Sequence, residues 1–321
     1  MKKILLFLFV TLVSLQSKSQ VSVLGEDASN FLEAYFTPLG ESFGAGLNNG
    51  WYNTAKPHKL GGFDLTLTLN AVSIPNNMQY FDPNNIDNFS SNSTTPTILG
   101  VGEGSEITYN NGNSMTFNMP NQGTFKKSLI PIPILNAGIG LVKKTELDFR
   151  YIPTYNYDLG FTGKGTVALW GIGVKHDLLQ WIPVIGNAIP VSISLQTGYT
   201  QLNTSFHLED GDNNASQEVN FNVKATTINL IASKKILMLT AYAGLGYNAS
   251  QTTFSSSTTF SIAELGGNNE FNVPLNMDFQ SVNDYRTNIG IRFNITVVAL
   301  QVNHTFSKYP VTTIGAGISL R

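Results

Sequence analysis

The sequence predicts an all-β fold: a transmembrane, antiparallel, up-and-down β-barrel of about 10 to 14 strands, preceded by a short, partly helical plug segment. Charged residues make up only 12 % of the 321 residues, whereas soluble domains carry about 25 %. Apolar and polar residues also alternate over segments of ten or so residues. A strand with one face in lipid and the other in a wet lumen has this composition and this period.

The first 19 residues have the features of a signal peptide. A basic start is followed by an apolar run at residues 4–13, and Ser17 and Ser19 occupy the −3 and −1 positions of a cleavage site. The apolar run is too short to favour the alternative, a membrane anchor that is not cleaved. We therefore expect residues 1–19 to be removed on export, and the mature chain to reach the outer membrane of a bacterium.

The alternation places the barrel within residues 60–321. No internal stretch reaches about 18 uninterrupted apolar residues, so no membrane-spanning helix is expected there. The expected strands are residues 61–73, 131–142, 145–155, 163–175, 190–203, 217–233, 236–255, 282–294, 296–307 and 310–321. Short links at 143–144 and 234–235 face one end and long polar links face the other, as in barrels with short periplasmic turns. Further strands are allowed for in 74–130, and residues 175–183 predict either a short amphipathic helix or a plain turn.

Residues 20–59 precede the first strand and are not strand-like. Residues 26–29 are a helix start, and a glycine-rich stretch follows at 40–50. Such a segment either folds into the lumen as a plug or lies in the periplasm. The apolar residues of this segment need cover, which favours the plug. The expected plug and ligand-contacting residues are Phe31, Leu32, Tyr35, Phe36, Phe43 and Asn53.

Charged residues recur on the polar sides or ends of the expected strands. They are Asp64, Glu146, Asp148, Arg150, Lys164, Lys175, Arg286 and Arg292. Two interpretations stay open for this set. The charges either pair across a closed lumen and hold it together, or they line a pore or binding cavity.

Catalytic, metal and nucleic-acid sites are not expected. The chain has no cysteine, which excludes disulfides and thiolate metal sites. Its four histidines are not spaced for a metal site, and the Gly-Glu-Ser-Phe-Gly match at 40–44 lacks the strand that a nucleophile elbow requires. No basic patch with interleaved aromatic residues is present. We therefore expect no enzyme activity, no cofactor and no nucleic-acid partner.

Residues 42–56, Ser-Phe-Gly-Ala-Gly-Leu-Asn-Asn-Gly-Trp-Tyr-Asn-Thr-Ala-Lys, resemble the N-terminal hatch of the long-chain fatty-acid and hydrocarbon transporter family of outer-membrane barrels. That family has Asn-Pro-Ala just before its first strand, and here Thr54 replaces the proline. The resemblance implies a plugged, fourteen-stranded barrel that carries hydrophobic molecules inward and releases them through an opening in its wall. A signal peptide that ends before Gln20 is also similar to those of Bacteroidota.

The predicted function is passive uptake of small, mainly hydrophobic molecules across the outer membrane. Outer loops would collect the ligand, the lumen would bind it, and movement of the plug would let it pass. The expected partners are outer-membrane lipid and a small hydrophobic ligand. The alternative is a structural or interaction barrel with a filled lumen, whose long outer loops at 74–130 and 256–281 bind a partner.

Overall fold

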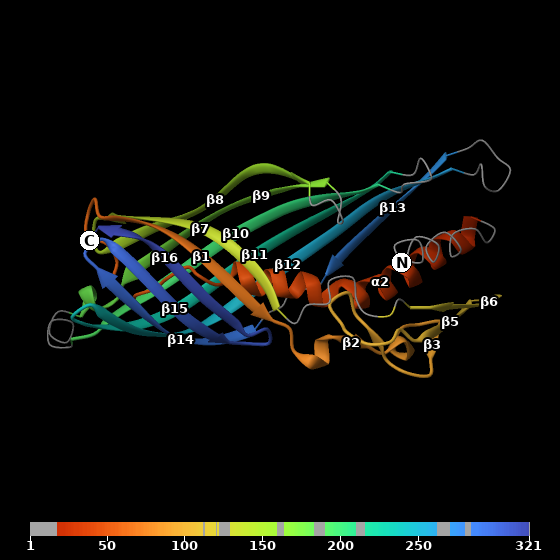
Figure 1. Cartoon of the computed structure of the whole chain (residues 1–321), viewed down its shortest axis with the longest axis horizontal. Helices are drawn as coiled ribbons and strands as arrows, with labels where there is room; N and C mark the ends of the chain where they lie inside the picture. The colour runs from red at the N-terminus through yellow and green to blue at the C-terminus, as the bar shows by residue number, and fades with distance from the viewer. Residues whose placement is uncertain are drawn as a thin grey trace.

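The computed structural model describes residues 18–111, 113–119, 121, 129–158, 164–182, 190–209, 216–261, 270–279 and 284–320. The expected signal peptide lies outside this range except for its last two residues. Ten of the eleven strands in the main sheet close into an antiparallel barrel around helix α2 (Lys18–Leu47), as Figure 1 shows. Within the described part of the chain, no helix is both long enough and apolar enough to cross a membrane.

Every strand of the barrel pairs with its neighbours along the chain. The barrel strands are β1 (Phe63–Ser73), β7 (Leu129–Leu141), β8 (Thr145–Asp158), β9 (Lys164–Asp177), β10 (Ser192–Glu209), β11 (Ser216–Ile236), β12 (Leu239–Ser261), β14 (Asp284–Ile295), β15 (Val298–Phe306) and β16 (Val311–Leu320). The first and last strands close the ring, with Phe63 opposite Leu320. The predicted fold class and its ten strands are confirmed, whereas the fourteen strands implied by the resemblance are not observed.

The faces of the strands are arranged inversely to those of a soluble protein. Along β15, Leu300 and Val302 are exposed on the outside, while Gln301 and Asn303 are buried inside. The other barrel strands alternate in the same way, because successive side chains of a strand point to opposite faces, although the inner face is apolar toward the long-loop end, as at Ile132 and Ile134 of β7. An apolar outer surface around an interior with many buried polar residues suits hydrocarbon outside and protein or water inside. The fold is therefore that of an outer-membrane β-barrel.

The two ends of the barrel differ in their connections. At one end, named here the short-turn end, β7–β8, β11–β12 and β14–β15 are joined by tight turns. Lys143, Lys144, Leu237 and Thr296 have positive φ angles of 46° to 55° there. The opposite end, the long-loop end, carries the links at 74–128, 210–215 and 262–283, and strand β13 (Glu270–Phe279) extends β12 beyond the barrel.

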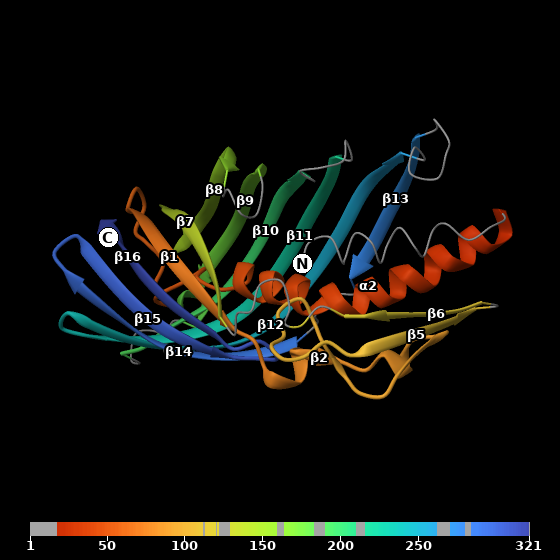
Figure 2. The same ribbon diagram turned by 45° about the vertical axis from the view of Figure 1, so that its right-hand side comes forward.

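The described residues between 74 and 121 add no strand to the barrel, which corrects the expectation of further barrel strands there. The segment instead forms two small sheets and two short 3-10 turns. They are β2 (Tyr80–Phe81) paired with β4 (Thr95–Pro96), the sheet of β3 (Phe89–Ser91), β5 (Glu106–Asn111) and β6 (Asn113–Asn118), η1 (Asn76–Met78) and η2 (Pro83–Asn85). The three-stranded sheet, named here the loop sheet, lies beside the N-terminal half of α2 at the long-loop end (Figure 2).

Helix α2 is longer than the sequence predicted. It is already helical at Lys18, includes Pro38, and continues through the glycine-rich stretch to Leu47. The glycine at position 44 lets the helix lie close to the wall, since a Cβ on Gly44 would collide with the side chain of Ser250. Of the two alternatives for residues 175–183, a helix or a plain turn, the structure shows one 3-10 turn, η3 (Leu179–Trp181), within the described part, and Lys175 to Asp177 still belong to strand β9.

Candidate functional site

The N-terminal segment runs through the barrel from the long-loop end to the short-turn end. Phe36 stacks on Phe254 of the β12 extension, with ring centroids 5.0 Å apart. Eleven residues after the last turn of α2, His58 reaches Ser319 near the end of the last strand, with Nε2 3.2 Å from Oγ. We name residues 40–59 the lumen segment, and its contacts with the barrel wall the seam. Figures 1 and 2 show α2 inside the ring of strands.

Two arginines on the wall hold the C-terminal end of α2. Arg150 of β8 donates from Nη1 to the carbonyl oxygen of Leu47 at 2.5 Å and from Nη2 to that of Asn49 at 2.6 Å. Arg286 of β14 donates to the carbonyl oxygen of Asn48 and to Asn49 Oδ1, both at 2.7 Å. The last carbonyls of a helix lack partners within the helix and carry partial negative charge. Buried guanidinium groups supply both the hydrogen-bond donors and the positive charge that these carbonyl groups lack.

After Leu47 the lumen segment has no regular secondary structure, and polar atoms of the wall bind it. Tyr52 donates its hydroxyl to Asn288 at 2.8 Å, and Arg292 donates to Asn53 Oδ1 at 2.5 Å. The backbone N–H of Ala55 donates to Ser233 Oγ at 2.9 Å. In its lower half the seam therefore combines hydrogen bonds with a small buried apolar cluster, which consists of Trp51, Tyr52, Ala55, Ile231 and Tyr242.

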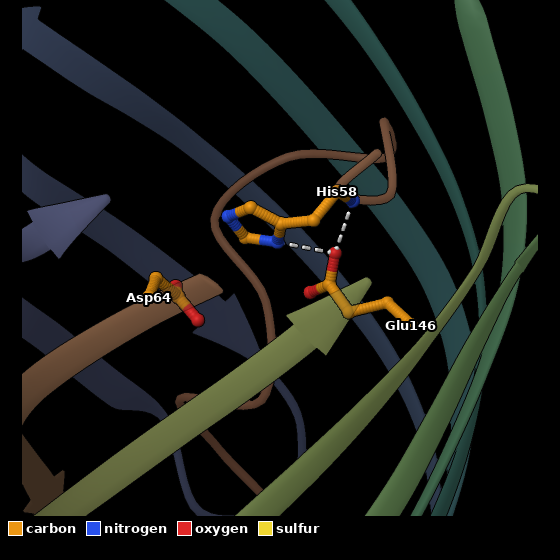
Figure 3. A group of neighbouring side chains, drawn as sticks. All are labelled: His58, Asp64 and Glu146. Carbon is orange, nitrogen blue, oxygen red and sulfur yellow. Dashed lines mark hydrogen bonds and ion pairs between the residues drawn. The ribbon is translucent and has the colours of Figure 1, made fainter. Parts of the chain in front are cut away.

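At the short-turn end, His58 joins a buried group of charged residues (Figure 3). Its Nδ1 and its backbone N both lie 2.7 Å from Glu146 Oε2. Lys175 of β9 donates to the other oxygen, Glu146 Oε1, at 2.5 Å. Each of these three side chains is at most 2 % exposed. This group fixes the end of the lumen segment to strand β8.

The upper half of the N-terminal segment is bound mainly by aromatic packing. Phe31 lies 4.6 Å from Phe89 of the loop sheet, measured between ring centroids, and Phe43 lies 5.9 Å from Phe221 of β11. Together with the stacked Phe36 and Phe254, these residues form what we call the aromatic collar. Leu32 and Tyr35 pack in the same apolar cluster. The structure thus brings together five of the six expected plug residues, while Asn53 lies apart in the polar lower half.

Two tyrosines of the long-loop end bind carboxylates of α2. Tyr109 of the loop sheet donates to Asp27 at 2.7 Å, and burial and this hydrogen bond raise the pKa of Tyr109 to about 12. Tyr309, in the link between β15 and β16, donates to Glu41 at 2.6 Å, and burial together with the negative charge of Glu41 raises the pKa of Tyr309 as well. Both phenols therefore stay protonated donors at neutral pH.

The expected lumen-lining residues lie mostly inside the barrel. Glu146, Asp148, Arg150, Lys175, Arg286 and Arg292 are all buried, and Asp64 is half-buried. Lys164 begins β9, but its side chain lies outside the described residues. A cavity of about 10 Å³ beside the end of α2, lined in part by Asn48 and Ser250, has room for about one water molecule.

Sequence reasoning missed His58 as a site residue and missed the wall serines that bind the segment. Ser233 lay on the polar side of an expected strand, so alternation indicated its inward position but not its partner. His58 had no local signal, since its partners Glu146 and Ser319 are 88 and 261 residues away.

The fold and the seam define a class of protein, an outer-membrane β-barrel whose lumen is occupied by its own N-terminal segment. Within that class, the chain belongs to a family of unknown function (DUF6588), which matches residues 1–320. A comparison with curated proteins finds no match. Membership of the hydrocarbon transporter family and an origin in Bacteroidota remain expectations, and so does the absence of enzyme activity.

Three solved structures illustrate the fold comparison. The translocator domain of the autotransporter NalP from Neisseria meningitidis is 7 % identical, with 92 % of this chain and 98 % of that chain covered and a TM-score of 0.34. The outer membrane protease OmpT from Escherichia coli is 9 % identical, with 85 % and 99 % covered and a TM-score of 0.34. The toluene transporter TodX from Pseudomonas putida is 7 % identical, with 80 % and 88 % covered and a TM-score of 0.19.

Proposed function

We propose that the protein is a plugged channel of a bacterial outer membrane, which passes small, mainly apolar molecules when its lumen segment is displaced. The observation that carries the proposal is the set of hydrogen bonds that Arg150 and Arg286 donate at the C-terminal end of α2. These bonds hold the segment from two opposite strands of the barrel, β8 and β14, so their loss would free it.

The chemistry of the seam supports a segment that can leave. A typical intramolecular hydrogen bond contributes only about 1 kcal/mol net, because water replaces the lost partner. Water entering an open lumen would solvate Ser233, Asn288 and the wall arginines in this way. If apolar packing alone filled the lumen, water could not replace the lost contacts, and displacing the segment would expose all of the buried apolar surface.

The aromatic collar supports an apolar ligand. Phe36, Phe43, Phe221 and Phe254 meet at the mouth where the long loops lie. Since long loops face the cell exterior in bacterial barrels, we assign the collar to the outer side and His58 to the periplasmic side. An apolar molecule that separates Phe36 from Phe254 would replace their contact with its own and loosen the helix.

Single-channel recording of the purified, refolded full-length protein in planar bilayers tests the proposal. Wild-type protein should be closed for most of the recording, and the Arg150→Ala/Arg286→Ala variant should open often. Lys235→Ala serves as the control, because Lys235 is an exposed cation beside a short turn. A double variant that stays silent although it is folded would overturn the proposal. Uptake of an apolar dye into liposomes by the same variants tests the ligand class.

A second candidate function, an interaction barrel, is favoured by one observation. The N-terminal half of α2 is tied to the loop sheet, where Asn88 and Tyr109 both donate to Asp27 at 2.9 and 2.7 Å. The loop sheet and the N-terminal half of α2 together would suit binding of a partner at the cell surface. Silence of every variant in the recordings above would favour this function over passage.

A further inference from the structure

We propose that a divalent transition-metal ion binds at the short-turn end of the lumen, between His58, Asp64 and Glu146. The three side chains come from three separate elements: the lumen segment, β1 and β8. One potential ligand atom of each lies within 4.8 Å of those of the other two, and Figure 3 shows the three side chains around a common space. The site is independent of whether the barrel passes molecules.

The spacing is close to that of a metal site. Zinc binds imidazole nitrogen and carboxylate oxygen at about 2.0 to 2.2 Å, so its ligand atoms lie about 3 to 4 Å from one another. His58 Nδ1 and Glu146 Oε2 are already 2.7 Å apart. Modest rotations of the Asp64 and Glu146 side chains would therefore bring the three ligand atoms to the spacing that zinc requires.

Neighbouring side chains orient two of the three ligands. In the structure His58 Nδ1 lies 2.7 Å from Glu146 Oε2, which also accepts from the His58 backbone N–H. A metal ion would take the place of the proton on Nδ1, and Nε2 would then donate to Ser319 Oγ, 3.2 Å away. Lys175 engages Glu146 Oε1, so Oε2 is the oxygen of Glu146 that would bind the ion. Outer-shell hydrogen bonds of this kind are typical of protein metal sites.

A second, independent observation comes from Asp148. Its side chain is 6 % exposed, and its Oδ2 has no hydrogen-bond partner among the described residues. A Cβ placed on Gly138 would lie 2.5 Å from Asp64 Oδ1, 3.0 Å from Asp148 Oδ1 and 3.4 Å from Glu146 Oε1. Three carboxylates thus converge on one small space, which glycine keeps open.

The charge of this group also suits a dication. The ion pair between Lys175 and Glu146 is the one bond of a lysine or arginine side chain to these three carboxyl groups among the described residues. The three carboxyl groups therefore share a single bonded cation. Buried charge of one sign needs a partner. A mixed set of imidazole and carboxylate ligands favours zinc or a similar transition metal over calcium, which takes six to eight oxygen ligands.

Bound metal would tie the lumen segment to the wall a second time. His58 would be joined to β1 through Asp64 and to β8 through Glu146, nine residues after Asn49, the last residue that Arg150 and Arg286 bind. The ion would therefore restrain the segment where it meets the periplasm.

Isothermal titration of metal-free, refolded full-length protein with zinc chloride tests the site. Wild-type protein should bind one ion per chain, and His58→Gln and Asp64→Asn should each weaken binding at least about tenfold. His176→Gln is the matched control, because His176 lies at the same end but bonds to Thr145, Gln180 and Trp181. It should bind zinc as wild type does.

Three outcomes would overturn the site: no zinc binding by folded wild type, undiminished binding by His58→Gln, or loss of binding only in His176→Gln. Heat-dependent migration on a denaturing gel verifies that each variant retains the barrel. Cobalt binding adds a spectroscopic measurement, since visible absorption bands that vanish in His58→Gln report ligation by that histidine. These outcomes are independent of conductance, so failure of the channel proposal leaves them unaffected.

Discussion

Arg150 and Arg286 donate to the same short stretch of chain from opposite sides of the barrel. Their strands, β8 and β14, are five positions apart in the ring of ten. Arg150 reaches the carbonyl oxygen of Asn49 at 2.6 Å, and Arg286 reaches the side-chain oxygen of the same residue at 2.7 Å. Asn49 thus joins two distant walls through the lumen, and the first prediction concerns this contact.

Replacing either arginine should destabilise the protein measurably. Hydrogen bonds to charged groups contribute about 1.5 to 3 kcal/mol each, and Arg286→Ala would leave the Asn48 carbonyl without its donor. We expect the free energy of unfolding in urea to fall by about 2 to 3 kcal/mol. The exposed-cation control Lys235→Ala should stay within about 0.5 kcal/mol of wild type. If Arg150→Ala and Arg286→Ala unfold with the same free energy as Lys235→Ala, the arginines do not hold the helix.

The close approach of α2 to the wall should make Gly44 intolerant of a side chain. A Cβ there would collide with Ser250, and overpacking of this kind costs about 1 to 3 kcal/mol. Gly44→Ala should therefore lower the unfolding midpoint, and adding Ser250→Gly should restore much of the loss by removing the obstructing atoms. A double variant no more stable than Gly44→Ala alone would contradict the packing described here.

The hydrogen bond between Tyr109 and Asp27 should hold the loop sheet on α2 only up to a certain pH. The pKa of Tyr109 is raised to about 12 in the folded protein, against about 10 in an unfolded chain. Because the folded pKa is the higher one, this stabilisation is complete below pH 10 and is lost as pH rises toward 12. Proteolysis within residues 76–111 should accelerate over this window. Tyr109→Phe should remove the part of that change due to the phenol, and an unchanged profile would exclude this role.

The assignment of the long-loop end to the cell exterior predicts which insertions antibodies can reach. An epitope placed after Asn92, in the exposed turn that follows β3, should be detected on intact cells. The same epitope between Leu237 and Met238 should be detected only after the outer membrane is permeabilised. The reverse labelling pattern would invert the orientation and place the aromatic collar on the periplasmic side.

The barrel was predictable because its signal is local and repeated. Alternation over ten segments places Glu146 inside and Phe149 outside without any knowledge of their partners. The end of α2 was not predictable in this way. Glycine disfavours a helix in solution, but Gly44 is needed where the helix passes the wall at Ser250. This requirement depends on a contact that is 206 residues distant in sequence.

The charged residues were expected inside the barrel, but their partners were not. The pattern left open whether the charges pair with one another or line a cavity. In the structure Arg150 and Arg286 bind backbone atoms of the lumen segment, and Glu146 binds Lys175 and His58. A pattern of side chains contains no information on backbone acceptors, so it does not predict that the wall arginines bind the backbone of the lumen segment.

The cysteine-free chain permits a direct test of the central claim, that movement of the lumen segment opens the barrel. Thr54 Oγ1 and Ser233 Oγ lie 3.2 Å apart across the seam, so cysteines at both positions are placed to form a disulfide. Single-channel recording would compare the oxidised and reduced forms of Thr54→Cys/Ser233→Cys in the Arg150→Ala/Arg286→Ala background, with each single cysteine as control. The account predicts silence in the oxidised form and openings that return on reduction. Openings that persist with the disulfide formed would contradict it.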